Sequence, residues 1–338
     1  TTATYGIPMW VQYTGGSSTS APTVAVANGT ATGCAVDATT FDLTSTSAGT
    51  CYVTITIPAD ANYLTASSAK TTVTVGKAPQ TPPTLTSTTG TYLTALTLTA
   101  TGGESTGSYS YAVAAGGTAT GCAIASGRLT STSTGTCLVI VTKATNTNYL
   151  AASSDPTAVT LNQANQAALK VTSTSGTYGT PLTLTTSGGS GTGAVTYTVV
   201  NGTATGCTVT NGVLTTTSAG TCSVTATKAA DSNYLAVSSS ATTITIAKAT
   251  QTPLVLTSTS GIVGTYLLLT YSGGSGTGAV TFSIVTGGTA SGAKIVTAGG
   301  SSYLYVTGAG TVNIVVKKAT DTCYLAAQSA TTAVTFTK

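Results

Sequence analysis

The chain repeats one pattern of residues four times, and this repetition constrains the fold more than any other feature. A Gly-Thr-Ala-Thr-Gly-Cys element ends at Cys34, Cys122 and Cys207, and a related element ends at Ala293. Successive copies lie 88, 85 and 86 residues apart. This period exceeds the roughly 20–50 residues of a solenoid repeat and gives each copy enough chain for its own core. The period therefore predicts four domains, at residues 1–77, 78–163, 164–248 and 249–338.

Within each repeat, apolar side chains alternate with hydroxyl side chains, which is the pattern of a half-buried β-strand. In the third repeat, Val195, Tyr197 and Val199 alternate with threonines, and Ile244 and Ile246 do the same. Threonine supplies about a quarter of the residues; it is β-branched and polar, and it favours strands without adding charge. Gly-Gly and Asn-Gly pairs separate the runs, as hairpin turns require. About seven strands per repeat predict an all-β chain of four tandem immunoglobulin-like β-sandwich domains.

The composition argues against several classes of function. The chain has no histidine and only 7 acidic residues, so we expect no enzyme activity, no cofactor and no metal site. Its 11 Lys and Arg residues are spread thinly, whereas nucleic-acid binding needs a dense basic patch. No stretch of about 18 consecutive apolar residues occurs, so no membrane span is predicted.

Seven cysteines form three candidate pairs and one singleton. In the fourth repeat both paired positions change together, to Ala293 and Val312, and loss of both partners at once is what a disulfide predicts. Buried free thiols are the alternative. Disulfides persist in oxidising compartments, so the pairs predict a secreted protein, either extracellular or at the cell surface. The predicted pairs are Cys34 with Cys51, Cys122 with Cys137, and Cys207 with Cys222, which leaves the fourth domain without an internal disulfide.

Three recurrent positions have both a structural and a functional interpretation. Cys323 stands where the other repeats have asparagine; it is a candidate intermolecular or free thiol, or a neutral replacement. A tyrosine follows the second cysteine position by 12 residues in every repeat, and we favour a packing role over a stacking surface for glycans or neighbouring subunits. Aspartates before this tyrosine are interpreted as turn residues rather than calcium ligands, because each repeat supplies at most one of them there. The residues are Tyr63, Tyr149, Tyr234 and Tyr324, with Asp60, Asp231 and Asp321.

The motifs that recur are Gly-Gly-Ser-Gly-Thr-Gly, Asn-Gly-Thr-Ala-Thr-Gly-Cys, Thr-Ser-Ala-Gly-Thr-Cys and Ala-Asp-Ser-Asn-Tyr-Leu. Across essentially the whole chain this pattern resembles bacterial immunoglobulin-like repeats, which occur in tandem in secreted surface proteins, adhesin stalks and extracellular fibres. The resemblance implies a structural subunit of a surface filament, with other copies of the chain as partners. The alternative is a spacer stalk that holds the binding domain of an adhesin away from the cell. Nothing in the sequence identifies a glycan or a host-surface ligand.

The first repeat lacks a segment that the other three contain. Repeats two to four open with runs that predict a first strand, at 83–87, 168–173 and 253–258, but only Thr1–Ala3 precede the Tyr-Gly turn of the first repeat. A sandwich without this edge strand exposes unpaired backbone groups and part of its core. Head-to-tail assembly through the terminal domains is the hypothesis, and the alternative is that the strand belongs to sequence upstream of Thr1. The short, proline-containing junctions predict a rod. The predicted assembly edge consists of Met9, Trp10, Val11 and Tyr13.

Overall fold

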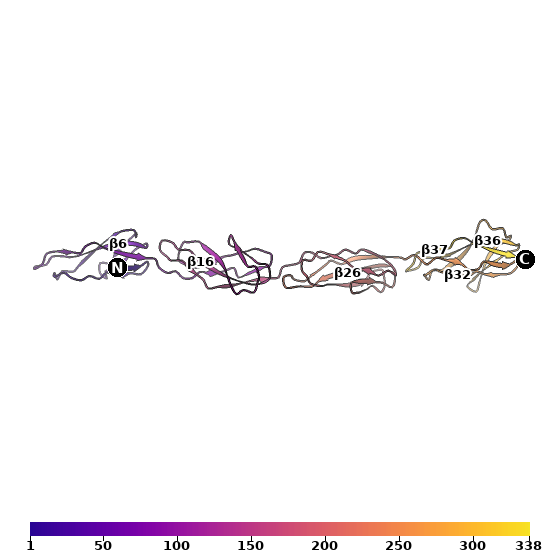
Figure 1. Cartoon of the computed structure of the whole chain (residues 1–338), viewed down its shortest axis with the longest axis horizontal. Helices are drawn as coiled ribbons and strands as arrows, with labels where there is room; N and C mark the ends of the chain where they lie inside the picture. Colours follow the sequence, from indigo (N-terminus) through magenta and orange to yellow (C-terminus); the bar gives the residue numbers. More distant parts are fainter. The chain divides into compact units, whose positions relative to one another are not determined.

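A computed structural model describes residues 1–338, which form strands and turns without any helix (Figure 1). The chain divides into two compact units, Thr1–Ala164 and Asn165–Lys338. Four separate hydrophobic cores are present, two in each unit. The predicted all-β class and the four repeated β-sandwiches are therefore confirmed.

The first domain contains a five-stranded and a three-stranded sheet. The larger sheet has the order β1-β8-β6-β3, with β7 paired to β6, and the smaller has the order β2-β5-β4. Strand β1 runs parallel to β8, and the other pairs are antiparallel. The strands are β1 (Thr2–Thr4), β2 (Met9–Trp10), β3 (Thr23–Asn28), β4 (Ala35–Val36), β5 (Asp42–Thr44), β6 (Gly49–Ile57), β7 (Ala66–Ser67) and β8 (Thr71–Gly76).

The second domain repeats these two sheets and adds a third. Its larger sheet has the order β10-β18-β16-β13 with β17 on β16, and its smaller sheet has the order β11-β15-β14. The added sheet pairs β9 with β12. The strands are β9 (Thr84–Leu85), β10 (Thr89–Thr91), β11 (Leu96–Thr97), β12 (Ala100–Thr101), β13 (Tyr109–Ala114), β14 (Ala123–Ala125), β15 (Arg128–Thr130), β16 (Gly135–Lys143), β17 (Ala152–Ser153) and β18 (Thr157–Asn162).

The third domain has the topology of the second, with the sheets β20-β28-β26-β23, β21-β25-β24 and β19-β22, and with β27 on β26. Its strands are β19 (Lys170–Val171), β20 (Ser175–Thr177), β21 (Leu182–Thr183), β22 (Thr186–Ser187), β23 (Val195–Asn201), β24 (Thr208–Thr210), β25 (Val213–Thr215), β26 (Gly220–Lys228), β27 (Val237–Ser238) and β28 (Thr242–Ala247).

The fourth domain has the sheets β30-β38-β36-β33, β31-β35-β34 and β29-β32, with β37 on β36. Its β34–β35 hairpin is longer than the corresponding hairpins of the other domains. Its strands are β29 (Val255–Leu256), β30 (Ser260–Ile262), β31 (Leu267–Leu268), β32 (Tyr271–Ser272), β33 (Val280–Val285), β34 (Lys294–Ala298), β35 (Ser301–Tyr305), β36 (Gly310–Lys318), β37 (Ala327–Gln328) and β38 (Thr332–Thr337).

The longest strand of each domain, labelled β6, β16, β26 and β36 in Figure 1, crosses the middle of the core. Along β16, Cys137, Val139 and Val141 are fully buried, while the residues between them are half-buried. This follows from the two-residue period of a strand, which sends alternate side chains to opposite faces. The side chains that the sequence predicted to face inward therefore form the core.

The two most repeated motifs contact each other. In the first domain, the backbone N–H of Thr30 donates to the Thr50 hydroxyl, and the N–H of Thr50 donates to the Thr30 hydroxyl, each at 2.9 Å. Gly49 has a φ of +143° and lies against the backbone of Ala31, where a side chain would collide. The same threonine pair recurs in the other domains as Thr118 with Thr136, Thr203 with Thr221, and Thr289 with Thr311.

Candidate functional site

Three disulfides tie the end of the Gly-Thr-Ala-Thr-Gly-Cys element to the central strand of its own domain. The cysteine on each central strand is completely buried. In the fourth domain Val312 is buried at this position, and Ala293 packs against the same core. Because disulfides persist where thiols are not kept reduced, the three bonds indicate an oxidising compartment. The bonds are Cys34–Cys51, Cys122–Cys137 and Cys207–Cys222, with Cα separations of 5.9, 6.0 and 6.1 Å.

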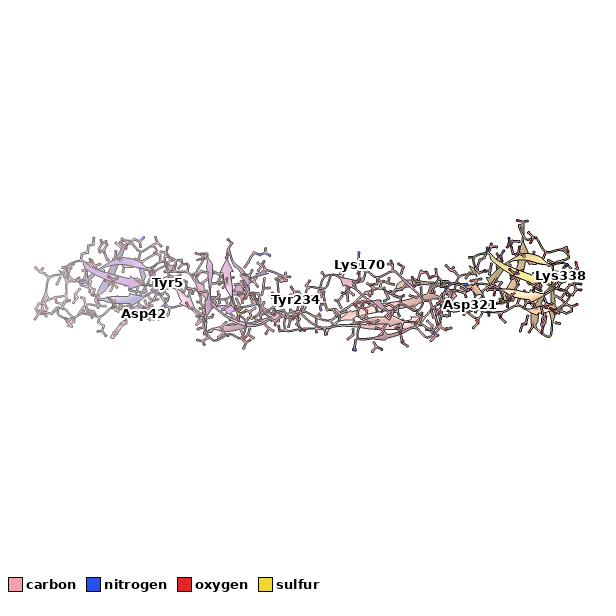
Figure 2. All side chains as sticks on the ribbon, turned by 45° about the vertical axis from the view of Figure 1, so that its right-hand side comes forward. Tyr5, Asp42, Lys170, Tyr234, Asp321 and Lys338 are labelled. Atoms are coloured by element: carbon pink, nitrogen blue, oxygen red, sulfur yellow. A yellow bond between two sulfur atoms is a disulfide. The ribbon has the colours of Figure 1, made fainter.

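Within the unit Thr1–Ala164, the first and second domains meet through a built junction. Ala78, which directly follows the last residue of the first domain, donates its N–H to the Asn148 carbonyl (2.8 Å), and its carbonyl accepts the Leu150 N–H (2.9 Å). The Ala48 N–H donates to the Asn148 side-chain oxygen at 3.1 Å. The rings of Tyr5 and Tyr149 meet edge to face, with centroids 5.5 Å apart, and Tyr5 is labelled in Figure 2. The junction is therefore a specific contact and not a free linker.

Within the unit Asn165–Lys338, the third and fourth domains form the same junction. The Ala249 N–H donates to the Cys323 carbonyl, and the Leu325 N–H donates to the Ala249 carbonyl, both at 2.9 Å. The rings of Tyr178 and Tyr324 again meet edge to face, with centroids 5.5 Å apart. The same geometry thus forms twice, from different stretches of chain. This repetition indicates that the junction is a property of the domain type.

Cys323 is a free, half-buried thiol at this second junction. Its Sγ donates to the Thr217 carbonyl of the third domain at 3.5 Å, and its hydrogen bond with Tyr178 raises the pKa of that phenol. The position corresponds to Asn148, whose side chain also bonds across its junction. The thiol therefore contributes to an intrachain contact, which the sequence interpretations did not include.

The loop that presents each junction tyrosine is held by an Asp or Asn side chain. In the first domain, hydrogen bonds to the carboxylate of Asp60 hold its pKa at about 2. The bond from the Thr19 N–H has the largest effect, and the bond from the Asn62 N–H has the next largest. In the fourth domain, the Cys323 N–H is the main cause that holds the pKa of Asp321 at about 2 (Figure 2). In the second domain, Asn146 accepts the equivalent bonds. These side chains act as turn caps, as the sequence predicted.

A groove opens on the first domain where the other domains have their two-stranded sheet. Its volume is about 480 Å³, and it is lined from β2, β6, β8 and the residues after β2. A second hollow of about 190 Å³ shares Tyr13 and Ile55 with it and continues to Ile57. Ile55 is half-buried, whereas its counterparts Val141 and Ala226 are fully buried. The core of the first domain is thus partly open along this edge.

The structure brings all of the predicted edge residues to this groove. Val11 is buried and Met9 half-buried, so these two side chains extend the core. Trp10 is 60% exposed and Tyr13 is 44% exposed, so these two form a rim. Trp10 lies between Met9 and Val11, so in an extended segment its side chain points to the opposite face. Tyr13 lies beyond the end of β2 and does not follow this alternation.

The assembly edge predicted from the sequence did not include the end of the first domain around Tyr63 and Leu64. Leu64 is 89% exposed, while its counterparts Leu150 and Leu325, which lie in the junctions, are 51% and 48% exposed. The signal was present in the sequence as the recurrent Asn-Tyr-Leu motif. It did not reveal that this motif receives the preceding domain, because that contact joins residues about 70 positions apart.

The fold and the site define a class: a tandem array of β-sandwich domains with internal disulfides and built domain junctions. The chain has no helix long and apolar enough to cross a membrane. No group of three or more His, Cys, Asp or Glu side chains lies close enough to hold a metal ion.

Comparison with known sequence families and with curated proteins gives no match for the chain. Among solved structures, Drosophila N-cadherin EC1-4 is similar at 11% identity and a TM-score of 0.25, covering 96% of this chain and 94% of that one. The S-layer protein SbsC is similar at 13% identity and 0.25, covering 94% of this chain and 50% of that one. The Escherichia coli adhesin FdeC is similar at 16% identity and 0.24, covering 97% of this chain and all of that one. Likenesses this distant carry no functional argument, so the function is argued from the residues.

Proposed function

We propose that the chain is a structural subunit of an extracellular bacterial surface filament in which copies join head-to-tail. The single observation that carries the proposal is the junction that forms twice within the chain with the same contacts. A contact between two different surfaces, repeated from copy to copy, produces an open filament rather than a closed dimer. The disulfides are consistent with a structural role in an oxidising compartment.

Each half of the junction has a counterpart on one of the terminal domains. The first domain presents Tyr63 and Leu64, which correspond to Tyr149 and Leu150. The fourth domain presents Ala309 and Lys338, which correspond to Ala48 and Lys77, and Val263 replaces the ring of Tyr5. Copies that use these surfaces would place the Ala309 N–H at the Asn62 side chain, as the Ala48 N–H lies at the Asn148 side chain, without the pair of aromatic rings.

Electron microscopy of the purified chain tests the proposal. Ordered polymers whose amount rises with protein concentration are expected, and Tyr63→Ala should reduce them because it removes the ring at the free pole. Val200→Ala, at an exposed position of the third domain, is the matched control and should polymerise normally. Cys323→Ser should also polymerise, because this thiol lies in an internal junction. Isolated particles at every concentration would instead favour the spacer stalk of an adhesin.

A further inference from the structure

In three of the four domains, one extended segment of chain fills the place of the open groove. These segments, at 80–87, 166–173 and 251–258, enter from the junction and form the short strands β9, β19 and β29. Each begins with a glutamine and places apolar side chains three and five positions later. These apolar residues are all buried: Pro83 and Leu85, Leu169 and Val171, Leu254 and Leu256.

The glutamine of each segment is held in the same way. The Gln80 side-chain N–H donates to the Leu150 carbonyl at 2.6 Å, and its oxygen accepts from the Ser105 N–H at 3.1 Å. Gln251 repeats both contacts, with the Leu325 carbonyl and the Gly276 N–H. Further along, each segment donates a backbone N–H to the neighbouring strand, from Thr86 to Thr99, Thr172 to Thr185 and Thr257 to Thr270.

The first domain retains the groups that hold such a segment. Ser18 corresponds to Ser105, and its hydroxyl donates to the Pro58 carbonyl at 2.7 Å, as that of Ser105 does to Ala144 at 2.6 Å. The serine backbone that meets the glutamine is therefore in the same local structure. Leu64, which corresponds to Leu150, is open to solvent.

The groove also has the shape that the segment needs. In the third and fourth domains a side chain at Gly188 or Gly273 would collide with the carbonyl oxygen of Ala168 or Pro253, both on the segment. Nothing lies within 4 Å of the equivalent position at Gly15. The site for a passing backbone is thus present and empty, beside an apolar lining that includes Val53 and Ile55.

We infer that this groove binds, in trans, an extended β-strand in which a glutamine is followed by apolar residues three and five positions later. The three filled domains carry the inference, because each holds a segment of this pattern at the equivalent place. Strand addition of this kind gains affinity from backbone hydrogen bonds and specificity from alternate side-chain pockets.

A synthetic peptide with the sequence of residues 249–258 tests the inference on the full chain. Trp10 is the single tryptophan and lines the groove, so its emission reports this site alone. Peptide binding should shift the emission to shorter wavelength in a saturable way. A control peptide that carries Leu254→Ser and Leu256→Ser should bind at least about 100-fold more weakly, because it lacks two apolar side chains that would be buried.

A variant in which the same ten residues precede Thr1 provides the structural control. The fused segment should fill the groove, give the emission of the saturated complex without added peptide, and abolish binding of free peptide. Absence of a saturable change with the unfused chain would overturn the inference. Equal binding to the fused chain, or equal binding of the serine peptide, would overturn it as well.

The two proposals fail separately. If the chain polymerises but the peptide does not bind, the strand-binding groove is wrong and the filament stands. If the peptide binds but no polymer forms under any condition, the groove stands and the filament is wrong.

Discussion

The first and fourth domains share a strand plan but complete their cores in different ways. The first has the Cys34–Cys51 disulfide and an open groove. The fourth has no disulfide, its groove is filled by β29, and Phe336 is buried where the first domain has Val75. A disulfide that closes a loop of this length contributes about 3 kcal/mol, and burial of one large apolar side chain contributes about 1.5–3 kcal/mol. The comparison indicates that this type of domain can fold without its internal disulfide when its hydrophobic core is larger.

The largest expected effect tests the enlarged core. Phe336→Ala should reduce the free energy of unfolding of the fourth domain by about 3–5 kcal/mol, because it leaves a cavity against β30, where Gly261 lies close to the ring. Hydrogen exchange across β36 and β38 during denaturant titration measures the loss. Thr335→Ala, on the exposed face of the same strand, should stay within about 0.5 kcal/mol. A loss below about 1 kcal/mol for Phe336→Ala would show that the ring does not substitute for the disulfide.

The second prediction gives the first domain the residues of the fourth. Cys34→Ala with Cys51→Val copies Ala293 and Val312, and it should cost about 3 kcal/mol, because neither a phenylalanine nor the missing strand compensates for the cross-link. Emission of Trp10 during denaturation follows this domain. The same exchange at Cys207 and Cys222 is the control; it should leave the third domain folded at denaturant concentrations that unfold the altered first domain. Equal denaturation midpoints for the altered first and third domains would show that the strand filling the groove of the third domain does not compensate for the lost disulfide.

The smallest expected effect concerns acid, to which the two domains should respond alike. Hydrogen bonds hold the pKa of both Asp60 and Asp321 at about 2, below the ordinary 3.8, so their stabilising contribution is complete above about pH 4 and is lost as the pH falls through about 2. Amide NMR shifts of Tyr63 and Tyr324 between pH 5 and pH 2 measure this loss. The Tyr149 amide should not follow it, since Asn146 has no proton to gain. A parallel shift at Tyr149 would assign the change to something other than the carboxylates.

The positions that the sequence interpreted correctly are governed by local rules. Asp60 and Asp321 cap turns because a carboxylate can accept the N–H groups two and three residues later, and this depends only on neighbours in the chain. The junction tyrosines are different. Their preferred interpretation was packing within one sandwich, yet Tyr149 contacts the first domain and Tyr324 contacts the third. That outcome depends on which ends of two domains meet, and no local pattern contains this information.

The sequence by itself determined the four-fold repeat, the all-β class and the faces of the strands, because the repeat period and the two-residue alternation are visible along the chain. It also showed that the first repeat differs from the other three in the residues ahead of its Tyr-Gly turn. Only the tertiary structure decided what that difference leaves behind: a groove of about 480 Å³ that Met9, Val11 and Ile55 line together. Its shape arises from strands far apart in the chain that pack side by side, and side-chain volume and packing, rather than sequence period, set the space between them.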